Sequence, residues 1–191
     1  MTNETLAAAE RVDLTLSQAA GEYRGTPLVR FLGKVSEVAD QPQLTTLNLL
    51  TVAAGAMRRD RQLLETGLHM LAAHALATLA KSVIKRSVDR TRPKLLVDEG
   101  RYTRRPGQRN EGPYNSFPSG HTAGAVAVAR ALARHYPAAA LPAYGAAAAI
   151  AFIQIPRCAH YVSDIGAGAL LGLASEAVVQ AAAEALLPDE I

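Results

Sequence analysis

Three short clusters in this sequence contain the residue types that phosphoryl transfer requires. Together they supply fixed positive charges, a hydroxyl, a glycine amide, two imidazoles and a carboxylate. Such a set can hold phosphoryl oxygens, attack phosphorus through a histidine and protonate the leaving group. In chain order the clusters are Lys85 with Arg92-Pro93, then Pro118-Ser119-Gly120-His121, then Arg157 with His160 and Asp164.

The third cluster contains the candidate nucleophile. His160 and Asp164 are four residues apart, so on a helix they share one face. A carboxylate bonded to one imidazole nitrogen fixes the tautomer and leaves the other nitrogen free to attack. Taken alone, the pair would be better explained as a helix cap beside an incidental histidine. Because the other clusters accompany it, we interpret His160 as the nucleophile and Asp164 as its orienting group.

The second cluster lies at a predicted helix start, where free backbone amides and the helix dipole attract anions. Ser119 can donate its hydroxyl and Gly120 its amide, since glycine lets backbone approach a phosphate closely. His121 can act as a general acid, because the ordinary histidine pKa lies near neutral pH. Without its neighbours, this cluster would indicate only a serine cap and a surface histidine.

The first cluster supplies fixed positive charge. An arginine such as Arg92 can bind two phosphate oxygens at once, whereas Lys85 acts as a point charge. Phosphoryl transfer spreads charge over the equatorial oxygens, and such cations stabilise it. The alternative is a pair of solvated charges beside a loop.

The order and spacing of the three clusters resemble those of the type 2 phosphatidic acid phosphatase (PAP2) superfamily. The resemblance runs from Lys85 to Gly168, and more weakly back to Asp13. It implies an all-α helical bundle that hydrolyses a phosphomonoester or pyrophosphate through a phosphohistidine. The expected catalytic residues are His160, His121 and Asp164. The expected phosphate-binding residues are Lys85, Arg92, Ser119, Gly120 and Arg157.

The third cluster departs from the family pattern. Members carry an arginine, usually after a serine, six residues before the nucleophilic histidine. Here Gln154 follows Ile153 at that place, and Arg157 lies three residues closer to His160. One helical turn separates positions 154 and 157, so we expect Arg157 to reach the same phosphate. The alternative is that its charge points elsewhere and the site has lost one cation.

Composition limits the other functions. A length of 191 residues predicts a single domain, with amphipathic helices in 1–40 and a helical catalytic core in 41–188. Nine of the twenty Lys and Arg lie between Lys85 and Arg109, a patch that can indicate nucleic acid. A phosphate-ester site explains it better, since Tyr102 alone adds an aromatic ring there. We expect no nucleic-acid partner, no metal site and no cofactor, and we interpret the lone Cys158 as a small buried residue.

Hydropathy favours a membrane-embedded bundle. Four stretches carry no formal charge, and a fifth is interrupted only by two glutamates; they are 41–57, 66–80, 112–129, 136–156 and 165–187. A spanning helix needs about 20 apolar residues, and several of these runs are shorter. The mean hydropathy of only +0.06 leaves a soluble, alanine-rich bundle as the alternative.

Charge distribution predicts an orientation. If the spans alternate, Arg58 to Arg61 and Arg130 to His135 fall on one side, and all three clusters fall on the other. Basic short loops mark the cytoplasmic side. The first ten residues also lack the basic run of a secretory signal. We therefore predict a multi-pass protein of the inner (plasma) membrane with an extracytoplasmic site.

Periodicity and breakers predict the elements. Helices are expected over 5–20 and 27–38, from 40–42 onward, over 62–87, from Ser119, over 138–155, and from Val162 to before Pro188. The stretch 89–117 contains three prolines and three glycines, which predict a long loop that covers substrate. No stretch alternates as a strand would.

Several alternatives remain. Phosphatidic acid, phosphatidylglycerophosphate and undecaprenyl pyrophosphate all fit this headgroup chemistry. A vanadate-dependent haloperoxidase would use the same oxyanion pocket, although the chain is short for that branch. A catalytically impaired protein that binds lipid phosphate would be consistent with Gln154.

Overall fold

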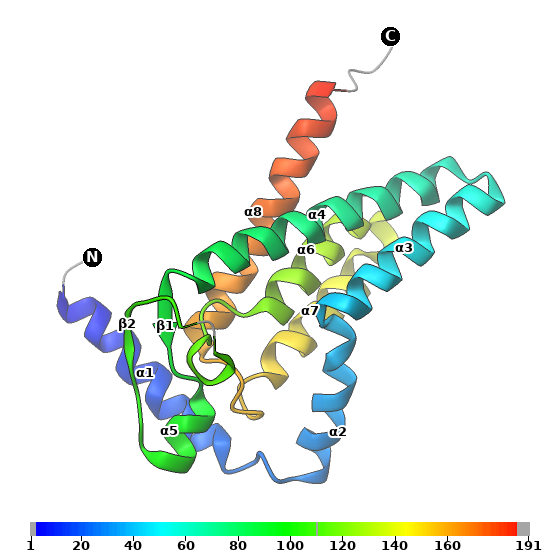
Figure 1. Cartoon of the computed structure of the whole chain (residues 1–191). Helices are drawn as coiled ribbons and strands as arrows, with labels where there is room; N and C mark the ends of the chain where they lie inside the picture. Colours follow the sequence, from blue (N-terminus) through cyan, green and yellow to red (C-terminus); the bar gives the residue numbers. More distant parts are fainter. Residues whose placement is uncertain (1–2, 110, 187–191) are drawn as a thin grey trace.

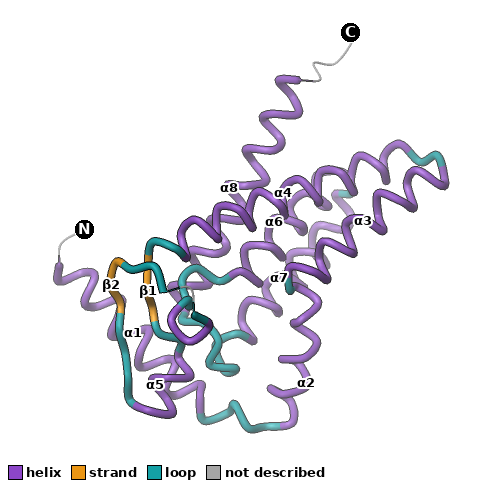
Figure 2. The backbone as a smooth tube through the Cα atoms, viewed as in Figure 1, coloured by secondary structure: helices purple, strands orange, loops and turns teal. Residues whose placement is uncertain are grey.

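A computed structural model of the chain describes residues 3–109 and 111–186, which are predominantly helical (Figures 1 and 2). The α-helices are α1 (Asn3–Gly21), α2 (Pro27–Ser36), α3 (Gln41–Arg58), α4 (Arg61–Lys85), α5 (Pro93–Glu99), α6 (Gly120–His135), α7 (Ala140–Ile153) and α8 (Val162–Leu186). Two short strands, β1 (Val88–Arg90) and β2 (Arg104–Pro106), accompany the 3-10 turns Glu37–Ala39, Gly112–Tyr114 and Pro137–Ala139. The all-α prediction is confirmed.

The centre of the bundle consists of α4, α6 and α8, each in contact with the other two. Helix α3 packs against α4, and α7 packs against α6. Small side chains fill the core between them, including Ala73, Ala77, Ala127 and Ala131, which are fully buried or nearly so. Small residues let helix backbones approach closely, so the alanine-rich composition suits this packing.

Glycines of α8 let this helix approach α6 closely, and Gly168 does so at the start of α6. A Cβ atom on Gly168 would lie 2.6 Å from the backbone oxygen of Ser119. Near the same contact, the Ser119 amide donates to the backbone oxygen of Asp164 at 3.0 Å. Two of the sequence clusters are therefore joined by backbone contact before any side chain is considered.

Local signals explain where the helices begin. The side chains of Thr26, Asp60 and Ser119 each accept a hydrogen bond from an amide in the first turn of α2, α4 and α6 respectively. Pro27 occupies the start of α2, where its missing N–H costs nothing. Helix α5 ends at Glu99 and is capped by Gly100, whose φ of +66° is readily adopted only by glycine.

The prediction of an irregular loop over 89–117 was wrong in part. This segment contains α5 and most of a β1–β2 hairpin, in which Arg90 pairs with Arg104. The expectation that the chain has no strands was therefore also wrong. Strands of three residues are too short for alternation to be visible, and buried contacts of Arg90 fix this hairpin. Helix α1 lies beside this segment and packs against α5 and α8.

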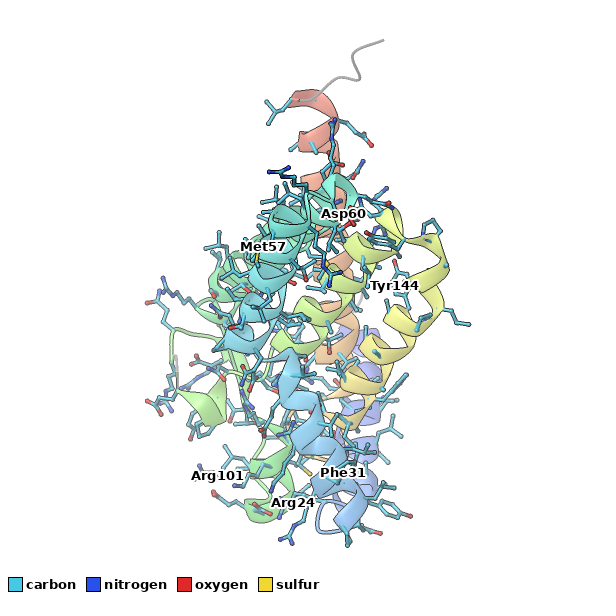
Figure 3. The ribbon with its side chains drawn as sticks, turned by 90° about the vertical axis from the view of Figure 1, so that its right-hand side faces the viewer. Arg24, Phe31, Met57, Asp60, Arg101 and Tyr144 are labelled. Carbon is cyan, nitrogen blue, oxygen red and sulfur yellow. The ribbon has the colours of Figure 1, made fainter. Side chains whose placement is uncertain are left out.

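Two helices, α4 and α8, are long and apolar enough to cross a membrane, and α7 is a shorter apolar helix. Only 28% and 22% of the residues in their most apolar windows are buried, whereas a core helix of a soluble protein would be mostly buried. Asp60, in the α3–α4 turn, lies near one end of the bundle, and Arg24 and Arg101 lie at the other (Figure 3).

Candidate active site

Residues of all three sequence clusters line one pocket of about 410 Å³. Its lining residues include the end of α4 and the start of α6. Both of these helix ends lie at the end of the bundle that carries the hairpin (Figure 1). The predicted site residues on its wall are Lys85, Arg92, Gly120, His121 and His160. Residues that are far apart in the chain thus surround a volume suited to a phosphate group.

His160 lies in the turn before α8, with its side chain on the pocket wall and only 2% of its surface exposed. Its Nδ1 faces Asp164 Oδ2 at 3.8 Å, an ion-pair distance beyond hydrogen-bond length. Catalytic contacts of this kind commonly shorten when substrate binds. With Nδ1 directed at the carboxylate, Nε2 is the nitrogen available for attack.

Burial governs the protonation of His160. Desolvation lowers its pKa, Asp164 opposes that shift, and the positive charges of Arg92 and Lys85 add to it, giving about 4. The imidazole is therefore neutral at physiological pH, which is the form a nucleophile needs.

Asp164 is fully buried at the start of α8 and uses both carboxylate oxygens. Its Oδ1 accepts from Arg90 Nη1 at 2.5 Å. Its Oδ2 accepts from Ser116 Oγ at 2.6 Å and from the Tyr161 amide at 2.9 Å. These bonds hold the carboxylate beside His160. Sequence reasoning singled out neither Arg90 nor Ser116.

The cations of the first cluster are held by a neighbouring asparagine. Lys85 Nζ donates to the backbone oxygen of Asn115, and Arg92 Nη2 donates to its side-chain oxygen at 3.3 Å. Burial lowers the pKa of Arg92, Asp164 opposes this, and Arg157 adds to the lowering. An arginine remains charged despite such a shift, so Arg92 faces the pocket as a positive charge.

The three residues of the second cluster, Ser119, Gly120 and His121, differ in their positions relative to the pocket. The Ser119 hydroxyl is buried, caps α6 and accepts from Thr122, and Ser119 is not among the described residues that line the pocket. Gly120 does line it, and a Cβ there would meet the side chain of Lys81 at 2.9 Å. His121 Nε2 lies 2.8 Å from Asp40 Oδ1, at the start of α3.

Arg157 lies apart from this pocket. Its Nη1 donates to Ser36 Oγ at 2.7 Å and its Nη2 to Glu37 at 3.3 Å, and it lines a second hollow against α2. Gln154 is fully buried and donates to the same Ser36 hydroxyl and to the Ile150 carbonyl. Arg157 is therefore not among the described residues that line the pocket, although its positive charge lowers the pKa of Arg92.

Helix α4 contributes a row of further wall residues, His74, Thr78 and Lys81, on the face that ends at Lys85. Their three- and four-residue spacing was readable, but nothing in the sequence showed that this face borders a site. Across residues 3–109 and 111–186, no group of three or more His, Cys, Asp or Glu is placed to hold a metal ion.

The model of the PAP2 superfamily matches residues 66–185, which include every predicted site residue. This chain belongs to the PAP2 superfamily. Its structure is similar to the transmembrane PAP2-type phosphatidylglycerolphosphate phosphatase of Bacillus subtilis, with a TM-score of 0.68 and 22% identity over 99% of this chain and 90% of that one. It is also similar to Aquifex aeolicus LpxE, with a TM-score of 0.67 and 19% identity over 88% of this chain and 94% of that one. No curated protein sequence matches the chain significantly.

Proposed function

We propose that this PAP2 protein is a metal-independent membrane phosphatase that hydrolyses a lipid phosphate or an isoprenyl pyrophosphate through a phosphohistidine. The observation that carries the proposal is the convergence of one neutral, buried imidazole with two cations and a second imidazole on a single pocket. Superfamily membership supports phosphatase chemistry, and exposed apolar helices support a substrate embedded in the bilayer.

In the first step, Nε2 of His160 attacks phosphorus in line with the leaving oxygen. The N–P bond forms as the bond from that phosphorus to the leaving oxygen breaks. This oxygen belongs to the lipid alcohol of a phosphomonoester, or to the lipid monophosphate that leaves from a pyrophosphate. His121 donates a proton to the departing oxygen, and Asp164 stabilises the charge that develops on His160. Lys85, Arg92 and the Gly120 amide bind the equatorial oxygens.

In the second step, water attacks the phosphohistidine. His121, now neutral, accepts a proton from that water, and the P–N bond breaks to release inorganic phosphate and neutral His160. The same group serves as acid and then as base, as reversibility of the proton transfer requires. Ser119 acts through its cap on α6, which fixes the Gly120 amide and the start of the His121 helix.

The outer surface supports a lipid substrate. Phe152 on α7 and Leu170 on α8 are 65% and 70% exposed, and further large apolar side chains are exposed on α3 and α4. Monomeric soluble proteins rarely expose such extended apolar surface. In a bilayer this surface contacts acyl chains, and the pocket lies at one end of the bundle near the headgroups.

Trapping the phosphoenzyme tests this mechanism. Purified protein mixed briefly with substrate labelled on the transferred phosphoryl group, then quenched in base, should carry label that is stable to base and labile to acid. The label should be absent in His160→Ala and present in His135→Ala, a histidine at the other end of α6. Label that persists in His160→Ala would contradict the nucleophile assignment.

A further inference from the structure

We infer that Arg90, held in place by Asp13 of α1, is a positioning residue that orients the Asp164 carboxylate toward His160. This inference rests on the proposed function. It adds a residue of the hairpin and a residue of the N-terminal helix to the catalytic apparatus, 74 and 151 positions from Asp164.

The guanidinium of Arg90 binds in a fixed geometry. Its Nη1 donates to Asp164 at 2.5 Å and to Ser163 Oγ at 2.7 Å, while its Nη2 donates to Asp13 at 2.7 Å. The Tyr161 ring lies under it, with 4.2 Å between Cζ and the ring centroid. The planar fork of an arginine matches this arrangement, whereas a lysine would supply only a point charge.

Asp13 ties the other side of the cluster to the start of α8. Its Oδ1 accepts from the Ser163 amide at 3.0 Å, and its Oδ2 accepts from the Ser163 hydroxyl as well as from Arg90. Arg90, Asp13 and Asp164 are each at most 3% exposed. Burying an unpaired charge costs free energy. Because Arg90 is the shared partner of both buried carboxylates, moving any one of the three groups would leave another unpaired.

The cluster of Asp13, Arg90 and Asp164 affects His160 directly. Arg90 binds one carboxylate oxygen of Asp164, and the other oxygen faces the imidazole. Arg90 takes Oδ1, and the Ser116 hydroxyl and Tyr161 amide approach Oδ2, the atom that faces Nδ1 of His160. Without Arg90 the carboxylate can rotate or take up a proton. Either change removes the negatively charged oxygen that faces Nδ1 at 3.8 Å, a charge that favours a proton on Nδ1 and leaves Nε2 free.

The test compares Arg90→Gln with a control variant at Arg104, another arginine that joins the hairpin to α1. Arg104 of β2 also bonds α1, through Glu10 at 3.2 Å, but on the exposed surface and away from Asp164. Arg90→Gln and Asp13→Asn should each lower kcat by about 10- to 100-fold, as loss of outer partners of catalytic groups commonly does. The KM should change little, because Lys85 and Arg92, the proposed phosphate ligands on the pocket wall, are unaltered in these variants. Arg90→Lys should keep part of kcat, and Arg104→Gln should leave it unchanged.

A double-variant cycle separates positioning from mere stabilisation. If Arg90 acts through Asp164, Arg90→Gln should change kcat by less than about twofold in an Asp164→Asn background. A full additional loss in that background, or an equal loss from Arg104→Gln, would overturn the inference.

A readout without turnover keeps the inference distinct from the proposed function. In protein labelled with 15N-histidine, assigned by comparison with His160→Asn, His160 should show the tautomer protonated at Nδ1. Arg90→Gln should lose that single tautomer, and Arg104→Gln should keep it. If wild type hydrolyses none of the substrates but shows this Arg90-dependent tautomer, the proposed function fails and the positioning role stands. An unchanged tautomer in folded Arg90→Gln would refute the positioning role.

Discussion

At the scale of single residues, the candidate site depends on a histidine that is buried and still borders the pocket. Burial keeps His160 neutral, and Asp164 lies on the Nδ1 side of its ring, which leaves Nε2 as the nitrogen proposed to attack phosphorus. Lys85 and Arg92 lower the pKa of His160 further, because a positive charge on the imidazole would be unfavourable beside them. The same residues that we propose to bind a phosphate thus help to keep the proposed nucleophile neutral.

The protonation of His160 gives a testable pH dependence. A free histidine takes up its proton near pH 6.5, whereas His160 should remain neutral until the pH falls to about 4. Lowering the pH from about 7 to about 5 should therefore leave the 15N signals of His160 in their neutral pattern. A titration midpoint near 6.5 would contradict the buried environment described here.

Arg92 and Arg157 should differ in their importance. Arg92 lines the pocket, so Arg92→Ala should lower kcat/KM by at least about 100-fold, as loss of an electrostatic clamp generally does. Arg157 bonds to Ser36 and Glu37 instead, so Arg157→Ala should cost about tenfold or less. Steady-state kinetics on both variants checks this, and equal losses would restore Arg157 as a direct phosphate ligand.

Residue types and spacing predicted the motif residues that meet in the pocket, because each cluster is local in the chain. They could not predict the Asp13–Arg90–Asp164 cluster, whose members come from three distant segments. Nor could they predict the contacts of Arg157. The one-turn spacing from Gln154 was a sound reason to expect it beside the phosphate, but Ser36 and Glu37 pack within its reach.

At the scale of elements, the site depends on how closely α8 approaches α6. Residues of α4, α6 and the turn before α8 can face one pocket only because small residues let these helices meet. The α-helices other than α5 were predictable to within a few residues from breakers and caps. The hairpin was not, since its strands are held by buried ionic contacts rather than by an alternating pattern.

Gly168 tests the role of this approach. Gly168→Ala places a methyl carbon 2.6 Å from the Ser119 carbonyl oxygen, so α8 must shift from α6. We expect a loss of about 1–3 kcal/mol in unfolding free energy and a drop in activity. Gly166→Ala in the same helix is the control, because its Cβ would meet no atom within 4 Å. Thermal unfolding of the two variants in detergent measures the difference, and equal stability would contradict the close packing.

At the scale of the whole molecule, the pocket and the α3–α4 turn lie at opposite ends of the bundle. The turn carries Arg58, Arg59 and Arg61, which favour the cytoplasmic side. The hairpin end is also basic, but its charges include the residues proposed to bind phosphate. The proposed membrane orientation therefore follows from the turn rather than from total charge.

Cysteine labelling tests that orientation. The native Cys158 is buried, so exposed cysteines introduced by Arg58→Cys and Arg101→Cys can be read separately. In intact spheroplasts a membrane-impermeant maleimide should label the Arg101→Cys variant and spare the Arg58→Cys variant until the membrane is opened. The reverse pattern would place the pocket on the cytoplasmic side.

The most direct measurement is phosphate release by the detergent-purified protein with a metal chelator present. The substrates would be phosphatidic acid, phosphatidylglycerophosphate and undecaprenyl pyrophosphate, with His160→Ala and His135→Ala assayed in parallel. The account predicts release by wild type and His135→Ala, and none by His160→Ala. Absence of release from all three substrates by folded wild-type protein, or undiminished release by His160→Ala, would contradict it.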